Sequence, residues 1–170
     1  KKIQWIANVD DDVYQPSYID VLRVAYTYKF NRGKFSDLVA LLSGRDFENR
    51  KNIQSIAEES YEKLSDGLSD FFKQSHYQRF INLIQSAGFI NHKLIGSKGS
   101  LNFSYSLYLK LRSENVAETQ IQNLVKRWFV MSLLTGRYSG SSETSIERDS
   151  KQILEKGIDV YLNQIESNEL

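Results

Sequence analysis

The residues of this chain best suited to bind an anion lie in one polar stretch between two apolar segments, LLTGRYSGSSETSIERD. Arg137 carries a planar guanidinium whose geometry matches the oxygens of a carboxylate or a phosphate, and Tyr138 follows it directly. One interpretation is that Arg137 pairs with an acidic residue of the same stretch while Tyr138 packs over the turn. The candidate acidic partners are Glu143, Glu147 and Asp149. The other is that Arg137 and Tyr138 face a neighbouring domain or a phosphate, which an exposed helix amino end would favour.

Two more basic residues, Lys126 and Arg127, precede this stretch and could converge with Arg137 into a patch that contacts phosphate. Further cations that could add to it are Lys110, Arg112 and Lys151. The alternative is an ordinary solvated helix surface. The whole chain has 22 Lys and Arg against 21 Asp and Glu, whereas dedicated nucleic-acid binders are usually far more basic. Any contact with DNA must therefore be local.

The same stretch predicts a turn between two helices. Gly136 stands where a helix end needs a residue that tolerates positive φ, and the serines after it bond readily to nearby backbone. Thr144 and Glu147 have the spacing of a capping box, in which each side chain bonds to the backbone of the other residue. Apolar residues on both sides then favour an antiparallel helical hairpin.

Apolar periodicity along the rest of the chain predicts an all-α fold, a single bundle-like domain over 1–170 with about six or seven helices. The only proline is Pro16, which leaves the remainder free for helices. The expected helices cover 17–30, a short segment that ends at Gly44, 53–72, 76–87, 101–111, 117–135 and 145–166.

Two of these segments carry further predictions. The segment 101–111 has apolar residues at every odd position, which also suits a strand, but only 3–9 could pair with it, so helix is preferred. The segment 117–135 is apolar nearly all round from Trp128 onward. It is therefore expected to be the central helix, with Trp128 in the core, and to form a hairpin with the last helix.

No other group of residues has the spacing of a catalytic or metal site, and we expect no catalytic residue, metal or cofactor. The acidic run at 8–12 lacks the alternation of a calcium loop, and His76 and His92 lack clustered partners for zinc. The glycine-rich segment 96–100 lacks P-loop spacing. Ten tyrosines could stack on bases, but most fall at helical core spacing.

The composition also leads to an expectation about the cellular compartment of the protein. There are no cysteines, which excludes disulfides and fits a reducing cytoplasm. Apolar runs are too short to span a membrane, so a cytoplasmic protein is expected. The chain opens without Met and ends without a clear helix stop, from which we expect a piece of a longer protein.

The stretch 126–149 resembles a segment of the GmrSD-type, modification-dependent (Type IV) restriction proteins. The matching positions are Trp128, Phe129, Gly136, Arg137, Tyr138, Ser139, Ser141, Glu143, Glu147 and Asp149. In that family a ParB/sulfiredoxin-like domain with a DGQQR motif hydrolyses nucleotide, and a His-Me finger nuclease often follows it. A helical region links the two, and the resemblance implies that this chain is much or all of that region.

The resemblance also implies what the chain lacks. It contains no DGQQR, and neither histidine lies in the proline-containing motif of the nuclease. We therefore expect a non-catalytic helical linking or regulatory domain of a DNA-targeting defence protein, whose partners are neighbouring domains of the same polypeptide and, in the full-length protein, DNA. Arg137→Ala is then expected to reduce restriction without changing the melting temperature of the chain. The alternative is a free-standing helical scaffold that binds a protein partner.

Overall fold

The computed structural model of the chain describes residues 12–169 and is helical over that range, with no strand in it. It confirms the predicted all-α fold. The described residues form eight α-helices and one 3₁₀ turn: α2 (Tyr18–Phe30), α3 (Phe35–Leu42), α4 (Gln54–Phe71), α5 (Gln74–Ser86), η1 (His92–Leu94), α6 (Lys98–Ser113), α7 (Glu118–Leu134), α8 (Ser142–Lys156) and α9 (Ile158–Glu169). None of the helices in this range is long and apolar enough to cross a bilayer.

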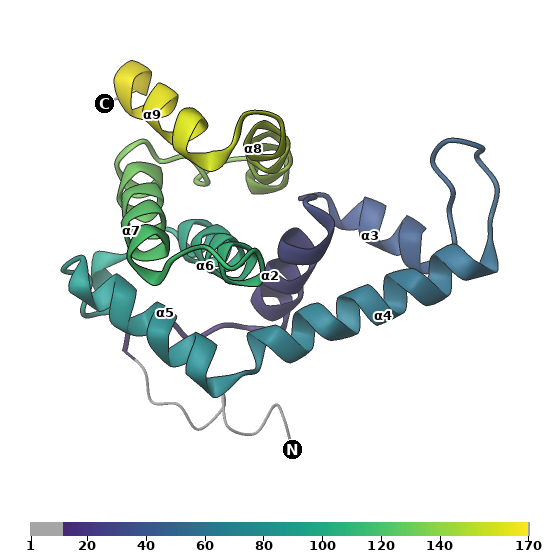
Figure 1. Cartoon of the computed structure of the whole chain (residues 1–170), viewed down its shortest axis with the longest axis horizontal. Helices are drawn as coiled ribbons and strands as arrows, with labels where there is room; N and C mark the ends of the chain where they lie inside the picture. The colour runs from purple at the N-terminus through teal and green to yellow at the C-terminus, as the bar shows by residue number, and fades with distance from the viewer. Residues whose placement is uncertain (1–11, 170) are drawn as a thin grey trace.

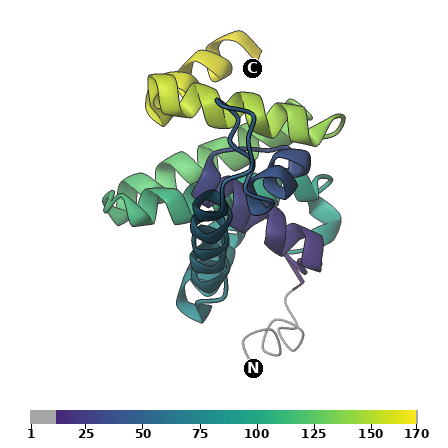
Figure 2. The ribbon, with the colours of Figure 1, turned by 90° about the vertical axis from the view of Figure 1, so that its right-hand side faces the viewer.

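The helices pack around α6, which contacts α2, α5 and α7 (Figure 1). At one end of the molecule α9 lies against α7 and α8. At the other side α3 and the long α4 project as an arm (Figure 1). In the view turned by 90°, α8 crosses the upper part of the molecule, with α9 above it and the other helices below (Figure 2).

The central element is α6, the segment whose periodicity left helix and strand open. Every residue from 100 to 109 is buried. Small polar side chains such as Ser104 and Ser106 occupy positions between the apolar residues. Because they are small, neighbouring helices can approach α6 from all sides. The Ser106 hydroxyl is satisfied within its own helix, where it donates to Asn102 O at 2.9 Å. The preference for helix is thus confirmed. The expectation that 117–135 is the central helix is only partly right, because α7 buries Trp128 and Phe129 but keeps an exposed face.

The last predicted helix, 145–166, is wrong as one continuous element. Gly157 interrupts it with φ +80° and ψ 152°, a backbone conformation open essentially only to glycine. The chain changes direction there and α9 starts at Ile158. The predicted hairpin of two long helices is therefore not formed. Of the two helices that take the place of 145–166, α9 rather than α8 is the main partner of α7.

Two apolar clusters hold the helices together. The larger includes α6, α7 and the buried faces of α5, α8 and α9, and the smaller joins α2 to the arm through Ala25, Tyr26, Leu38 and Leu64. Leu68 packs against both clusters, so arm and body share side chains.

The connection between α2 and α3 is fastened to α8. The Gly33 amide donates to the Glu147 carboxylate at 2.6 Å. A Cβ at position 33 would lie 2.5 Å from the backbone oxygen of Glu143, closer than any real contact, so only glycine fits there. The start of the arm is thereby held against α8, which follows the corner, the turn of residues 135–141 between α7 and α8.

Candidate functional site

The chain turns between α7 and α8 at the predicted glycine. Gly136 has φ +60°, and the next amide, that of Arg137, donates to Ser132 O at 3.0 Å. This confirms the expected helix stop.

The predicted capping box is wrong. α8 begins at Ser142 with Ser141 as its N-cap and no side-chain cap, so Thr144 lies inside the first turn. The Glu147 carboxylate is engaged by the Gly33 amide, a contact from a distant segment that local spacing could not reveal. The Ser141 hydroxyl instead donates to the Thr144 hydroxyl at 3.1 Å.

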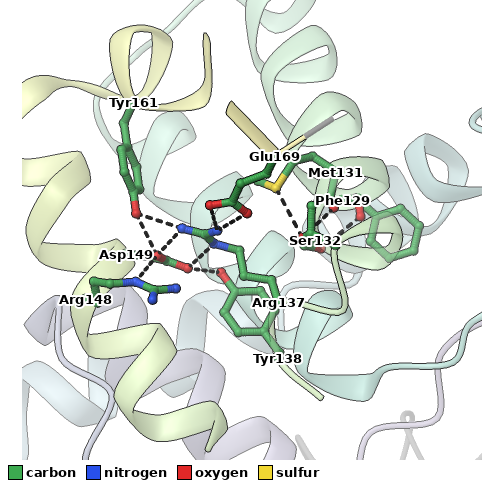
Figure 3. A network of polar contacts seen from close by, with 10 residues as sticks. Phe129, Met131, Ser132, Arg137, Tyr138, Arg148, Asp149, Tyr161 and Glu169 are labelled. Atoms are coloured by element: carbon green, nitrogen blue, oxygen red, sulfur yellow. Dashed lines mark hydrogen bonds and ion pairs between the residues drawn. The ribbon is translucent and has the colours of Figure 1, made fainter. Parts of the chain in front are cut away.

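Behind this corner Arg137 and Asp149 form a buried, two-pronged ion pair (Figure 3). Arg137 Nε donates to Asp149 Oδ2 and Arg137 Nη2 to Oδ1, both at 2.8 Å. The side chains are 5% and 0% exposed. Such parallel charge-assisted bonds are among the strongest polar contacts in proteins.

Two tyrosine hydroxyls complete the shell of Asp149. Tyr138 donates to Oδ2 and Tyr161 to Oδ1, each at 2.9 Å, and Arg148 Nε approaches Oδ1 at 3.3 Å. The third nitrogen of Arg137, Nη1, reaches Glu169 near the end of α9 at 3.0 Å. The carboxylate thus joins the end of α7, the corner, α8 and α9 in one network.

The buried charges shift the titration of their neighbours. Burial raises the pKa of Tyr138 well above its ordinary value, and the charge of Asp149 raises it further. Burial likewise raises the pKa of Tyr161, again reinforced by Asp149. Burial of Arg137 opposes its charged form, but the bonds and charge of Asp149 outweigh it and raise the pKa of the guanidinium. Arg137 therefore stays charged and both tyrosines stay protonated.

Aromatic rings enclose this network. Trp128 is fully buried, as predicted, with its ring centroid 5.9 Å from that of Tyr161 and 5.2 Å from that of Phe103 on α6. The ring centroid of Tyr138 also lies close to that of Phe103, at 5.4 Å. The corner is thus packed directly on the central helix.

This geometry decides between the two interpretations of Arg137. Its three nitrogens all donate to oxygens of the protein, and Tyr138 is buried. Neither side chain is presented to a phosphate or a neighbouring domain, so the expected external contact by these two residues is wrong. The pairing of Arg137 with Asp149 is the arrangement found.

The other basic residues do not form the expected patch. Arg127 binds two residues of α9, Glu166 and, at 2.7 Å, Asn163. The bonds to Glu166 are the main reason that the pKa of the Arg127 guanidinium is raised. Lys126 points elsewhere, to Ser86 Oγ on α5 at 3.2 Å. Of the further cations, Arg112 pairs with Glu118 and Lys151 with Glu155. An ordinary solvated surface describes them better.

The two histidines lie apart. His76 is half-buried with Nδ1 3.2 Å from Asp70 O, and burial lowers the pKa of its ring; His92 is exposed. In the part of the chain that the structure describes, no three His, Cys, Asp or Glu side chains are placed to hold a metal ion. Most of the acidic run at 8–12 lies outside the described residues.

Sequence reasoning missed three members of the network, Arg148, Tyr161 and Glu169. Tyr161 falls in the apolar stripe of the last helix, a signal for burial but not for its hydroxyl bond. Glu169 lies in a polar end with no periodic signal. Comparisons of the chain with models of protein families, with curated proteins and with solved structures find no match.

Proposed function

We propose that this chain is the non-catalytic helical linking domain of a modification-dependent restriction protein, where it braces a nucleotide-hydrolysing domain and a nuclease domain. The support comes from the stretch 126–149, which resembles the helical region of the GmrSD-type proteins.

One observation carries the proposal. Four of the ten positions on which the resemblance rests, Trp128, Arg137, Tyr138 and Asp149, meet in a single internal network: Arg137 and Tyr138 both bond to Asp149, and the Arg137 guanidinium lies over the Trp128 ring. The shared residues therefore specify a rigid corner between helices. A motif that specifies geometry suits a domain whose task is to hold other domains in place.

The test uses the full-length protein and a mild change to the corner. Tyr161→Phe keeps the ring but removes the hydroxyl that links Asp149 and Arg137. If the corner transmits a conformational signal between the two outer domains, restriction of modified phage DNA by this variant should fall by about tenfold, which is within the usual size of a coupling between sites. Nucleotide hydrolysis should stay unchanged.

Tyr61→Phe is the matched control, because Tyr61 on α4 is 59% exposed. Thermal melting of both variants shows whether either is simply unfolded. Unchanged restriction in a folded Tyr161→Phe protein would contradict the bracing role. Flanking coding sequence without a DGQQR motif upstream and a nuclease histidine motif downstream would contradict the family assignment itself.

A free-standing scaffold for a protein partner is the second candidate. Large apolar side chains are exposed on several helices, including Leu154 on α8 and Val160 on α9. Flanking sequence that lacks both motifs would favour this candidate.

A further inference from the structure

A small hollow lies where α2, α6 and α8 meet. Polar residues of all three helices line it, with Thr27 and Asn31 on α2, Ser106 and Lys110 on α6, and Ser150 on α8. Thr27, Ser106 and Ser150 are buried, whereas Asn31 and Lys110 are partly exposed. The hollow therefore gathers polar side chains from three helices in a largely buried place.

One of these polar groups is unsatisfied by the protein. The Thr27 hydroxyl has no hydrogen-bond partner in the described part of the chain, although Thr27 is only 5% exposed. Buried polar groups are nearly always bonded, either to protein or to ordered water, and an unbonded one destabilises the fold. A molecule bound in the hollow would satisfy this hydroxyl.

The size of the hollow limits what this molecule can be. The space open to the centre of a water-sized sphere is about 20 Å³. A single buried water needs roughly 10–15 Å³ and two to four polar partners. The hollow thus suits one water rather than a larger ligand.

The groups around the hollow supply both donors and acceptors. The Lys110 ammonium has three donors, one of which is directed to Asn31 Oδ1. The Ser106 hydroxyl directs its hydrogen to backbone oxygens, with Asn102 O at 2.9 Å and Val24 O at 3.2 Å, so its own oxygen is left to accept. Water both donates and accepts, which matches this set, whereas an anion only accepts.

We propose that the hollow binds one ordered water molecule that links α2 to α6 beside α8. The water accepts hydrogen bonds from the Thr27 hydroxyl and the Lys110 ammonium and donates one to the Ser106 oxygen. Three such bonds are typical of a buried water. The site does not depend on the proposed function of the chain.

A crystal structure of the chain, at a resolution that shows ordered water, tests the site directly. Density for a water should lie about 2.5–3.2 Å from Thr27 Oγ1 and within reach of Lys110 Nζ. A Thr27 hydroxyl that bonds directly to a protein atom, with no water beside it, would overturn the proposal.

The sign of a stability change tests it in solution. Thr27→Val keeps the shape and nearly the helix propensity of the side chain but removes the hydroxyl. If the water satisfies Thr27, the melting temperature should fall by about 2–4 °C, the effect of one hydrogen bond in a chain of this size. A rise in melting temperature would show instead that the hydroxyl is unbonded, and would contradict the proposal.

Ser104→Ala is the matched control. Ser104 is fully buried and its hydroxyl also lacks a partner among the described residues, but Ser104 does not line the hollow. Its replacement should leave the melting temperature unchanged or raise it, because no bond is lost. An equal fall in both variants would count against a water specific to the hollow.

A double-mutant cycle tests whether Thr27 and Lys110 share the water. The structure has no direct bond between these two side chains. If both bond to the same water, the loss of stability in a chain with Thr27→Val and Lys110→Met should be smaller than the sum of the two single losses. Losses that add up would mean that the two side chains have no common partner, against the proposal.

Discussion

At the scale of single residues, Asp149 is the most heavily engaged side chain of the corner. Its two oxygens accept from Arg137, Tyr138 and Tyr161, and its side chain has no exposed area. A buried pair of this kind is a weak argument for net stability, but removal of one partner leaves the other charge uncompensated.

We therefore expect Arg137→Ala to lower the free energy of unfolding by about 3–5 kcal/mol, measured by urea denaturation. This replaces the expectation, drawn from the sequence, that the melting temperature would not change. Glu169→Gln is the matched control, because it alters the same guanidinium from a side chain that is 44% exposed and should change stability by about 0.5 kcal/mol or less. Equal effects of the two variants would show that the Asp149 pair is not the dominant contact.

The sequence predicted part of this site. Arg137, Asp149 and the buried Trp128 could be named, because a charged pair close in sequence and an aromatic residue in an apolar helix are local signals. The choice of Asp149 over Glu143 and Glu147 could not be made. It depends on Gly33 and Arg23, more than a hundred residues away, which engage the two glutamates.

At the scale of elements, Gly157 sets the path of the C-terminal helices. A Cβ there would meet nothing within 4 Å, so its constraint is purely conformational. We expect Gly157→Ala to cost about 1–3 kcal/mol because its dihedrals suit only glycine. Thermal or urea unfolding measures this loss.

Gly140→Ala serves as the control. Its Cβ would also meet nothing within 4 Å, and Gly140 does not have a positive φ. That substitution should be neutral or slightly stabilising, because alanine restricts the unfolded chain more than glycine does. A similar loss in both variants would mean that the backbone conformation at Gly157 is not the cause.

The sequence predicted which segments are helical better than it predicted where one helix ends and the next begins. The periodicity of 53–72 and 76–87 reflects amphipathic helices at the surface, where one face is buried and pattern matches structure. The break at Gly157 was hidden, because apolar residues continue on both sides of it at helical spacing. Burial of α6 on all sides was masked by serines, which look polar in sequence but occupy little volume in a packed interior.

At the scale of the whole molecule, hydrogen-bonded and partly buried carboxylates make stability depend on pH. Burial of Asp20 opposes its charged form, but hydrogen bonds from Ser17 and Asn102 outweigh it and lower the pKa of the carboxyl. Burial of Asp70 is likewise outweighed by bonds from residues that include Lys73 and Tyr28, and its pKa is also lowered.

A carboxyl whose pKa is lower in the folded state stabilises the fold above its unfolded pKa, and this contribution is lost as the pH falls through the folded pKa. Unfolding by urea should therefore require less denaturant at pH 3 than at pH 7. Asp20→Asn should be less stable at pH 7 but lose less on acidification. A variant whose acid loss equals that of the unchanged chain would exclude Asp20 as a source.

The helix α2 has one face in each apolar cluster, with Val21, Val24 and Tyr28 toward the body and Ala25 and Tyr26 toward the arm. The arm cannot come loose without exposing side chains of the same helix that hold the body together. We therefore expect the arm and the body to unfold together as one cooperative unit.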